Sequence, residues 1–232
     1  MDKSSIRRFV SGAFPARYAI PYVIVVYGIF TGLILVSTTF YNGDYSLFTN
    51  SVSNLGDPLL NPFPGWLFFS IALWSFGFIA MPLFLYQGRR LIAEQRRRAL
   101  IFMVFSTIAC AGSIGVGIFS EVEETYPLHI ATAVMAFGGL FLAAIFTWVP
   151  CFSIAKRTPQ KRLRTIRFSI TTAQIIVIMF TAAVTATVYI QEEMFGNVGV
   201  GLLSTTFWEW MLMFCIGAHV LLLTANVSFD SK

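Results

Sequence analysis

The chain has few charged residues and few cysteines. Asp, Glu, Lys and Arg make up 12% of its 232 residues, about half of the fraction that is usual in a soluble domain. This shortage excludes an ordinary soluble globular domain. The three cysteines, Cys110, Cys151 and Cys215, all lie within or at the edge of apolar runs, which excludes a disulfide framework.

Known catalytic signatures are also missing. The sequence has no G-x-S-x-G motif and no H-E-x-x-H motif, so nothing points to a serine hydrolase elbow or to a zinc peptidase helix. It also lacks the internal repeat that many transporters show. A zinc site built on His129 and carboxylates would have a single nitrogen ligand, and we predict no metal and no other cofactor.

Apolar residues are abundant: they make up 56% of the chain and give a mean hydropathy of +0.74. They form six continuous blocks, each long enough to supply the about 20 helical residues that cross a hydrocarbon core. Continuous blocks favour helices over the alternating strands of a membrane barrel. We predict an all-α integral membrane protein, a six-transmembrane-helix bundle with spans at Ala19–Phe40, Trp66–Tyr86, Ala99–Ser120, Leu128–Phe152, Phe168–Tyr189 and Gly201–Asn226.

The segments outside these blocks differ in charge. All 16 Lys and Arg residues precede the first span, follow the sixth, or lie between spans two and three or four and five. Because basic residues remain on the cytoplasmic side, we predict that both termini are cytoplasmic. The predicted organisation is a basic N-terminus (1–18), a transmembrane domain (19–226) and a tail (227–232), in the plasma membrane or an endomembrane.

The basic segments account for the pI of about 9.3, so no nucleic-acid partner is predicted. We expect them to attract anionic lipids of the inner leaflet. The segment KRTPQKRLRTIR is in addition a candidate for specific phosphoinositide binding. A membrane-protein or cytoplasmic partner at these loops is a further alternative.

Eight of the 11 acidic residues fall on the other side of the predicted membrane. Glu121, Glu123 and Glu124 are expected to form a solvated turn. Glu209 is different, because it lies between two tryptophans in STTFWEWMLMF, roughly 10–12 Å below the outer boundary of span six. A carboxylate at that depth is costly unless it faces the bundle interior, a partner or water.

The first outer loop, TNSVSNLGDPLLNPFPGW, mixes turn residues with apolar ones. This mixture predicts a loop that folds back against the helix ends. We expect Gly56 in this loop to adopt a conformation that a β-branched residue resists. His129 opens span four on the same side. We therefore predict one shared pocket, formed by Glu209, His129, Asp57, Asn54 and Ser53.

Structural interpretations of the same residues are also open. Glu209 is a candidate brace between helices, and His129 is a candidate cap of span four. His219 follows Glu209 by ten residues and lies about 15 Å deeper. We therefore predict that His219 forms hydrogen bonds between helices and takes no part in the pocket.

Several stretches occur in an order that resembles one family: NSVSNLG, GIFSE, LHIATAVMAFGGLF and FWEWMLMFCIGAH. The chain resembles, over about residues 20–226, the six-span family of the damage-regulated autophagy modulators and the post-GPI-attachment lipid-remodelling factor. The resemblance implies a six-helix bundle and links to GPI-lipid remodelling, autophagy and membrane-lipid organisation. It is carried by Ser51, Ser53, Gly56, His129, Ala133, Phe137, Glu209 and Trp210.

We favour a protein that binds or remodels membrane lipid through the outer pocket, with Ser53, Asn54, Asp57 and Trp210 binding the ligand. In an acyl-transfer or hydrolytic enzyme, Glu209 would be the acid or base, or would orient His129 as the base. The alternatives are a non-catalytic membrane regulator or scaffold and a small transporter with Glu209 as its ion site.

Overall fold

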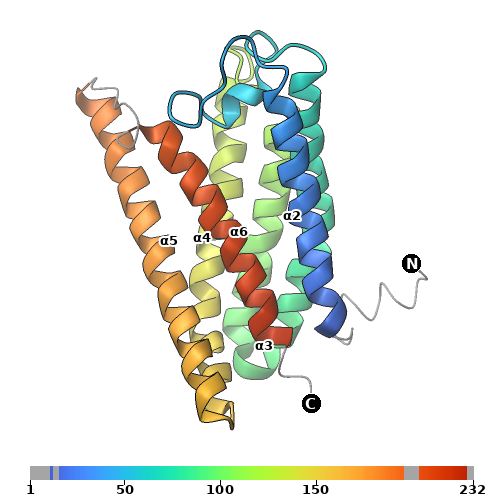
Figure 1. Ribbon diagram of the computed structural model, residues 1–232, viewed down its shortest axis with the longest axis vertical. Coiled ribbons are helices and arrows are strands. Elements are labelled where there is room, and N and C mark those ends of the chain that lie inside the picture. Colours follow the sequence, from blue (N-terminus) through green and yellow to red (C-terminus); the bar gives the residue numbers. More distant parts are fainter. Residues whose placement is uncertain (1–10, 13–15, 196–203, 229–232) are drawn as a thin grey trace.

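The computed structural model describes residues 11–12, 16–195 and 204–228 of the chain. These residues form five α-helices and one short 3-10 helix, with no strand among them (Figure 1). The all-α prediction is therefore confirmed. The elements are α2 (Ala16–Thr38), η1 (Ser53–Gly56), α3 (Gly65–Ile118), α4 (Tyr126–Arg157), α5 (Lys161–Phe195) and α6 (Thr205–Ser228).

All five α-helices are long and apolar enough to cross a membrane. The helix α3 has 54 residues, about 81 Å of helix, against a hydrocarbon core of about 30 Å. Its course is interrupted at Gln95, where φ is −151° and ψ is 90°. The Ser113 hydroxyl donates to Leu73 O at 3.1 Å, so the two halves of α3 run side by side. They contain the second and third predicted spans, while the count of six membrane crossings stays a prediction.

Small residues let the second half of α3 approach α4 closely. A Cβ at Gly112 would lie 2.4 Å from the backbone nitrogen of Ala136, and one at Gly139 would lie 2.9 Å from Phe105 O. Such contacts are typical of helices that pack inside a membrane. They hold α3 and α4 together without a large side chain between them.

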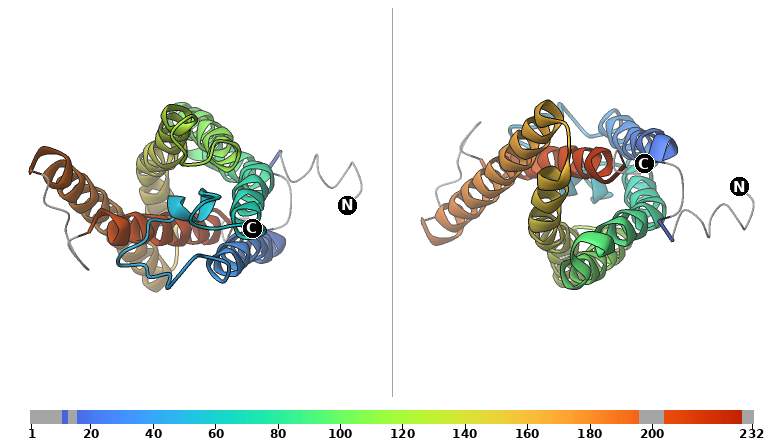
Figure 2. Two further views of the ribbon diagram at one scale, coloured as in Figure 1. Left: turned by 90° about the horizontal axis from the view of Figure 1, so that it is seen from above. Right: turned by 90° about the horizontal axis from the view of Figure 1, so that it is seen from below.

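The helix α5 lies at the periphery, where it packs against α4 and α6 and leans away from the rest of the bundle (Figure 2). Large apolar side chains are exposed along it, among them Ile176, Phe180 and Ile190. Exposed apolar side chains of this kind suit a helix whose outer face contacts lipid. The buried core therefore lies mainly among α2, α3, α4 and α6.

His219 connects three helices in the interior. The Thr147 hydroxyl donates to Ala144 O at 2.7 Å, so its oxygen accepts from His219 Nε2 at 3.3 Å. His219 Nδ1 then accepts from Gln174 Nε2, also at 3.3 Å. These bonds join α4, α5 and α6, and they confirm the prediction that His219 is a hydrogen-bond partner between helices.

Charged residues gather at opposite ends of the bundle. The turn at Gln95 and the α4–α5 connection carry arginines and lysines, and we call this end the basic end. The opposite end, which we call the loop end, carries the first loop (residues 39–64) and the connection 119–125 (Figure 1). The helix α2 begins and α6 ends at the basic end. The separation of charge agrees with the predicted orientation, while the cytoplasmic position of the termini stays a prediction.

Candidate functional site

The first loop is folded against the ends of the helices, as its mixed composition predicts. The Asn61 amide donates to Ser37 Oγ at 2.9 Å and to Leu55 O at 2.8 Å. The Ser37 hydroxyl donates in turn to Gly65 O at 2.9 Å. Asn61 and Ser37 are fully buried, so this network fixes the loop to α2 and to the start of α3.

A second set of contacts attaches the loop to α6. The Trp210 indole donates to Asn50 O at 3.3 Å, and its ring meets the Tyr45 ring edge-on with 6.2 Å between centroids. Burial raises the pKa of the Tyr45 hydroxyl, and the nearby Glu209 carboxyl raises it further. Trp210, predicted as a ligand-binding residue, is buried beneath the loop and holds it in place.

Glu209 links α6 to the same loop. Its carboxyl accepts hydrogen bonds from the backbone N–H of Val52 and from the Ser53 hydroxyl. The helix α6 begins at Thr205, four residues after the predicted start of the span, so Glu209 lies about 6 Å from the helix end. This is nearer to the helix end than a span starting at Gly201 implies, while the depth of roughly 10–12 Å below the membrane boundary stays a prediction. Glu209 is half-buried at the loop end and braces a helix against a loop.

Asn54 and Asp57 form local hydrogen bonds that shape the loop around η1. Asn54 Oδ1 accepts from the backbone N–H of Ser51 at 3.0 Å and from the Ser51 hydroxyl. Asp57 Oδ1 accepts from the backbone N–H of Leu59 at 2.8 Å. Side chains of these types commonly stabilise turns in this way. Both residues are half-buried, and their predicted contact with a ligand stays a prediction.

The expectation that Gly56 adopts a backbone conformation that a β-branched residue resists is wrong. Among the described residues, only Gly12 and Gly43 have positive φ. Gly56 is instead pressed against an aromatic ring, because a Cβ there would lie 2.7 Å from Phe69 Cε1. The position needs glycine for space, and the ring of Phe69 supplies the constraint.

His129 and Glu121 complete the loop end. His129 is buried, and its Nδ1 donates to Phe119 O at 2.8 Å, which ties α4 to the end of α3. Glu121 is half-buried: burial raises its pKa, His129 lowers it and Asp57 raises it. Glu121 also interacts electrostatically with Glu209. Glu121 therefore interacts with both residues that the sequence pairs, Glu209 and His129, while these two form hydrogen bonds with different segments.

Glu121 was expected to be solvated like its neighbours, and for this residue that expectation is wrong. Glu123 and Glu124 are exposed, and the three acids look alike in sequence. The one available signal was position, since Glu121 ends the family-like stretch GIFSE. A joint reaction centre of Glu209 and His129 stays a prediction.

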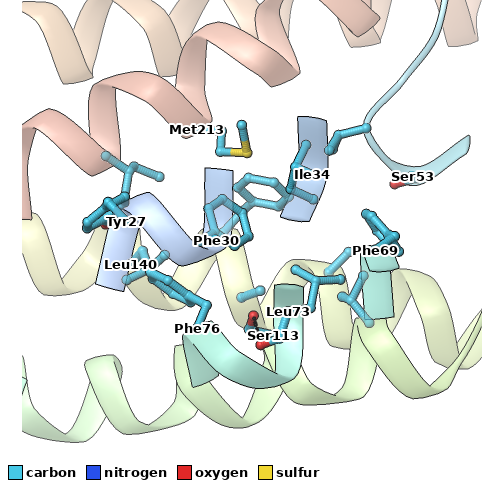
Figure 3. A pocket seen from close by; sticks show the side chains of 16 residues that line it. Tyr27, Phe30, Ile34, Ser53, Phe69, Leu73, Phe76, Ser113, Leu140 and Met213 are labelled. Carbon is cyan, nitrogen blue, oxygen red and sulfur yellow. Dashed lines mark hydrogen bonds between the residues drawn. The ribbon is translucent and has the colours of Figure 1, made fainter. Parts of the chain in front are cut away.

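An apolar cavity of about 70 Å³ lies beside the first loop, from which Ser53 reaches its edge (Figure 3). Ser53 and Val52 line its outer end, and Ser113 and Tyr27 supply the other two side-chain hydroxyl groups of its lining. The Ser113 hydroxyl is bonded to Leu73 O. The remaining lining residues come from α2, α3, α4 and α6: Tyr27, Phe30, Ile34, Phe69, Leu73, Phe76, Val116, Ala133, Ala136, Phe137, Leu140, Met213 and Ile216.

Five of the eight residues that carry the family resemblance line this cavity or contact residues that line it. Ser53, Ala133 and Phe137 line it. Gly56 packs against Phe69, which also lines it. Glu209 binds the two loop residues at its outer end. Positions spread over most of the chain therefore meet around one small volume.

The polar group and the cavity together make an amphipathic site: carboxyl groups above, and a wall of apolar side chains below. A site of this kind can hold a molecule that has a polar head and an apolar tail. Among the described residues, no group of three or more His, Cys, Asp or Glu side chains is placed to hold a metal ion.

The chain matches a protein-family model, the Frag1/DRAM/Sfk1/Cwh43P N-terminal domain, over residues 16–228. The match covers every helix described above, and it is the family that the sequence motifs resemble. The comparison with curated proteins gives no match, and neither does the comparison with solved structures.

Proposed function

We propose that this chain, which belongs to the Frag1/DRAM/Sfk1/Cwh43P family and is an integral multi-pass membrane protein, binds a membrane lipid at its loop end. The head group lies near Glu209, and one acyl chain enters the apolar cavity. The observation that carries the proposal is that two residues belong to both parts of the site: Val52 and Ser53 donate hydrogen bonds to Glu209 and also line the cavity.

A groove between α2 and α6 supports a route from the cavity to the bilayer. It has a volume of about 310 Å³, and Tyr27, Phe30 and Met213 line both the groove and the cavity. The cavity itself, at about 70 Å³, is smaller than the about 150 Å³ of an engineered cavity that binds benzene. A whole acyl chain would therefore extend from the cavity along this groove.

Charge at the loop end selects the head group. Glu209, Glu121 and Asp57 interact electrostatically, and the described residues at this end include no Lys or Arg. Such a surface disfavours an anionic head group and favours one that donates hydrogen bonds from an amine. We expect an ethanolamine-type phospholipid to bind more tightly than phosphatidylglycerol.

The test is a lipid titration of the purified protein in non-ionic detergent, followed by native mass spectrometry. Ala133→Phe places a ring in the cavity and should weaken binding of phosphatidylethanolamine by about tenfold or more. Ala133→Leu is the milder variant in case the larger ring disturbs folding. The matched control is Ala131→Phe, because Ala131 is exposed on the same helix and should bind as the wild type does. Wild-type affinity in both Ala133 variants would overturn the proposal.

A further inference from the structure

At the basic end, two basic side chains near the α4–α5 turn interact with other residues of the protein. Arg157 forms an ion pair with Glu94 at 3.2 Å. Arg167 is buried, and its guanidinium donates to Thr158 Oγ1 at 2.8 Å. Lys156 and Arg164, by contrast, are exposed and have no ion pair within the described part of the chain. Their charge remains available to a ligand.

Lys156 and Arg164 line a common concave surface of about 260 Å³, which we call the turn pocket. Lys156 comes from the end of α4. Arg164, Thr165, Phe168 and Ser169 come from the start of α5, where residues four apart share one helix face. The Thr165 hydroxyl donates to Lys161 O at 3.1 Å. The charged donors toward the pocket are therefore Lys156 and Arg164, with the Ser169 hydroxyl beside them.

The position of the turn pocket relative to the bilayer follows from the length of α5. The helix has 35 residues, about 52 Å, and extends well beyond a hydrocarbon core of about 30 Å. Its first seven residues contain four cations, whereas apolar residues prevail from Phe168 onward. The hydrocarbon therefore begins near Phe168, whose ring packs on Phe152 with 4.8 Å between centroids. The cations lie just outside this level, where lipid phosphates are found.

We propose that the turn pocket binds the phosphate of an anionic phospholipid from the adjacent leaflet. Lys156 and Arg164 neutralise the phosphate, Ser169 donates a further hydrogen bond, and Phe168 contacts the upper part of an acyl chain. Two cations match the charge of about −1.5 to −2 on a phosphomonoester. The volume of about 260 Å³ lies below the about 300 Å³ at which pockets begin to hold drug-sized molecules. Phosphatidic acid therefore fits better than a lipid with a large sugar head group.

The test compares two charge-matched double variants in non-ionic detergent, where no charged bilayer surface is present. Phosphatidic acid is titrated and counted by native mass spectrometry. Lys156→Gln/Arg164→Gln should lose about tenfold in affinity. Lys161→Gln/Arg162→Gln removes the same charge from the same turn, outside the pocket lining, and should change affinity less than about twofold. Both pairs are exposed, so the fold should be kept, which thermal unfolding verifies.

Two outcomes would overturn this inference. Equal losses in the two double variants would mean that the basic end attracts anionic lipid only through its overall charge. Competition by glycerol phosphate as strong as that by phosphatidic acid would mean that the ligand is a soluble phosphate. Ala133→Phe at the loop end should leave phosphatidic acid binding unchanged, so failure here is distinguishable from failure of the proposed function.

Discussion

Replacing Gly56 with valine tests whether the first loop is packed against the bundle. A Cβ at this position would lie 2.7 Å from Phe69 Cε1 and 2.9 Å from Cδ1. Phe69 is only 2% exposed, so its ring has little room to move away. Inserting atoms into a packed core costs typically about 1–3 kcal/mol. Gly56→Val should fall in the upper part of this range, because it adds two methyl groups beyond the Cβ, and Gly56→Ala should fall in the lower part.

The assay is thermal unfolding in detergent, followed by tryptophan fluorescence, together with the yield of monodisperse protein. Gly28→Val is the matched control, since Gly28 is exposed in α2 and a Cβ there meets nothing within 4 Å. We expect the order of stability to be wild type and Gly28→Val, then Gly56→Ala, then Gly56→Val. Phe69→Leu replaces the ring with a smaller side chain and should reduce the loss of stability caused by Gly56→Val, as expected for residues in contact. If Gly56→Val and the wild type unfold at the same temperature, the inference that the first loop is packed against the bundle is refuted.

Three further predictions concern charge, the interior and topology. Glu121→Gln should raise thermal stability at pH 7, because burial raises the pKa of Glu121 and makes its charged form unfavourable in the folded protein. This gain in stability should shrink as the pH falls through that raised pKa. A gain in stability that does not depend on pH would contradict burial of the charged form as its cause. His219→Leu should lower the free energy of unfolding by about 1–3 kcal/mol by leaving buried groups unpaired, with lipid binding unchanged; loss of lipid binding at full stability would show that His219 acts in the site. For topology, single cysteines are introduced after the native ones are replaced, and intact cells are treated with an impermeant reagent. Cysteines at Asp44, Glu123 and Gln191 should be labelled, whereas cysteines at Gln95 and Gln160 should not. The reverse labelling pattern would mean that the orientation is inverted.

Features that depend on local composition could be predicted from the sequence. Long apolar runs require helices in a membrane, so the helical segments were predictable, and so was the fold-back of a loop that mixes turn and apolar residues. The interruption of α3 at Gln95 falls within the arginine-rich connection between two predicted spans. His219 was predictable as an interhelical partner because a polar group at that depth needs one.

Features that depend on distant contacts could not be predicted in this way. Glu121 has the same chemistry as Glu123 and Glu124, and only the fold buries the first of them in part. The constraint on Gly56 comes from Phe69 across the packed interface. Asn61 fixes the first loop because its amide donates hydrogen bonds to both Ser37 Oγ and Leu55 O. The cavity is formed by the first loop and four helices, and no single stretch of sequence contains enough of it to be recognised.

The most direct test of the central claim uses phosphatidylethanolamine that carries a photoactivatable diazirine on one acyl chain. The protein in nanodiscs is irradiated, and the labelled residues are mapped by peptide mass spectrometry. Lipid binding at the loop end predicts labels on cavity residues such as Phe137 and Met213, and it predicts their loss in Ala133→Phe but not in Ala131→Phe. Labels confined to exposed positions such as Val134 and Phe180, equal in all three proteins, would contradict it.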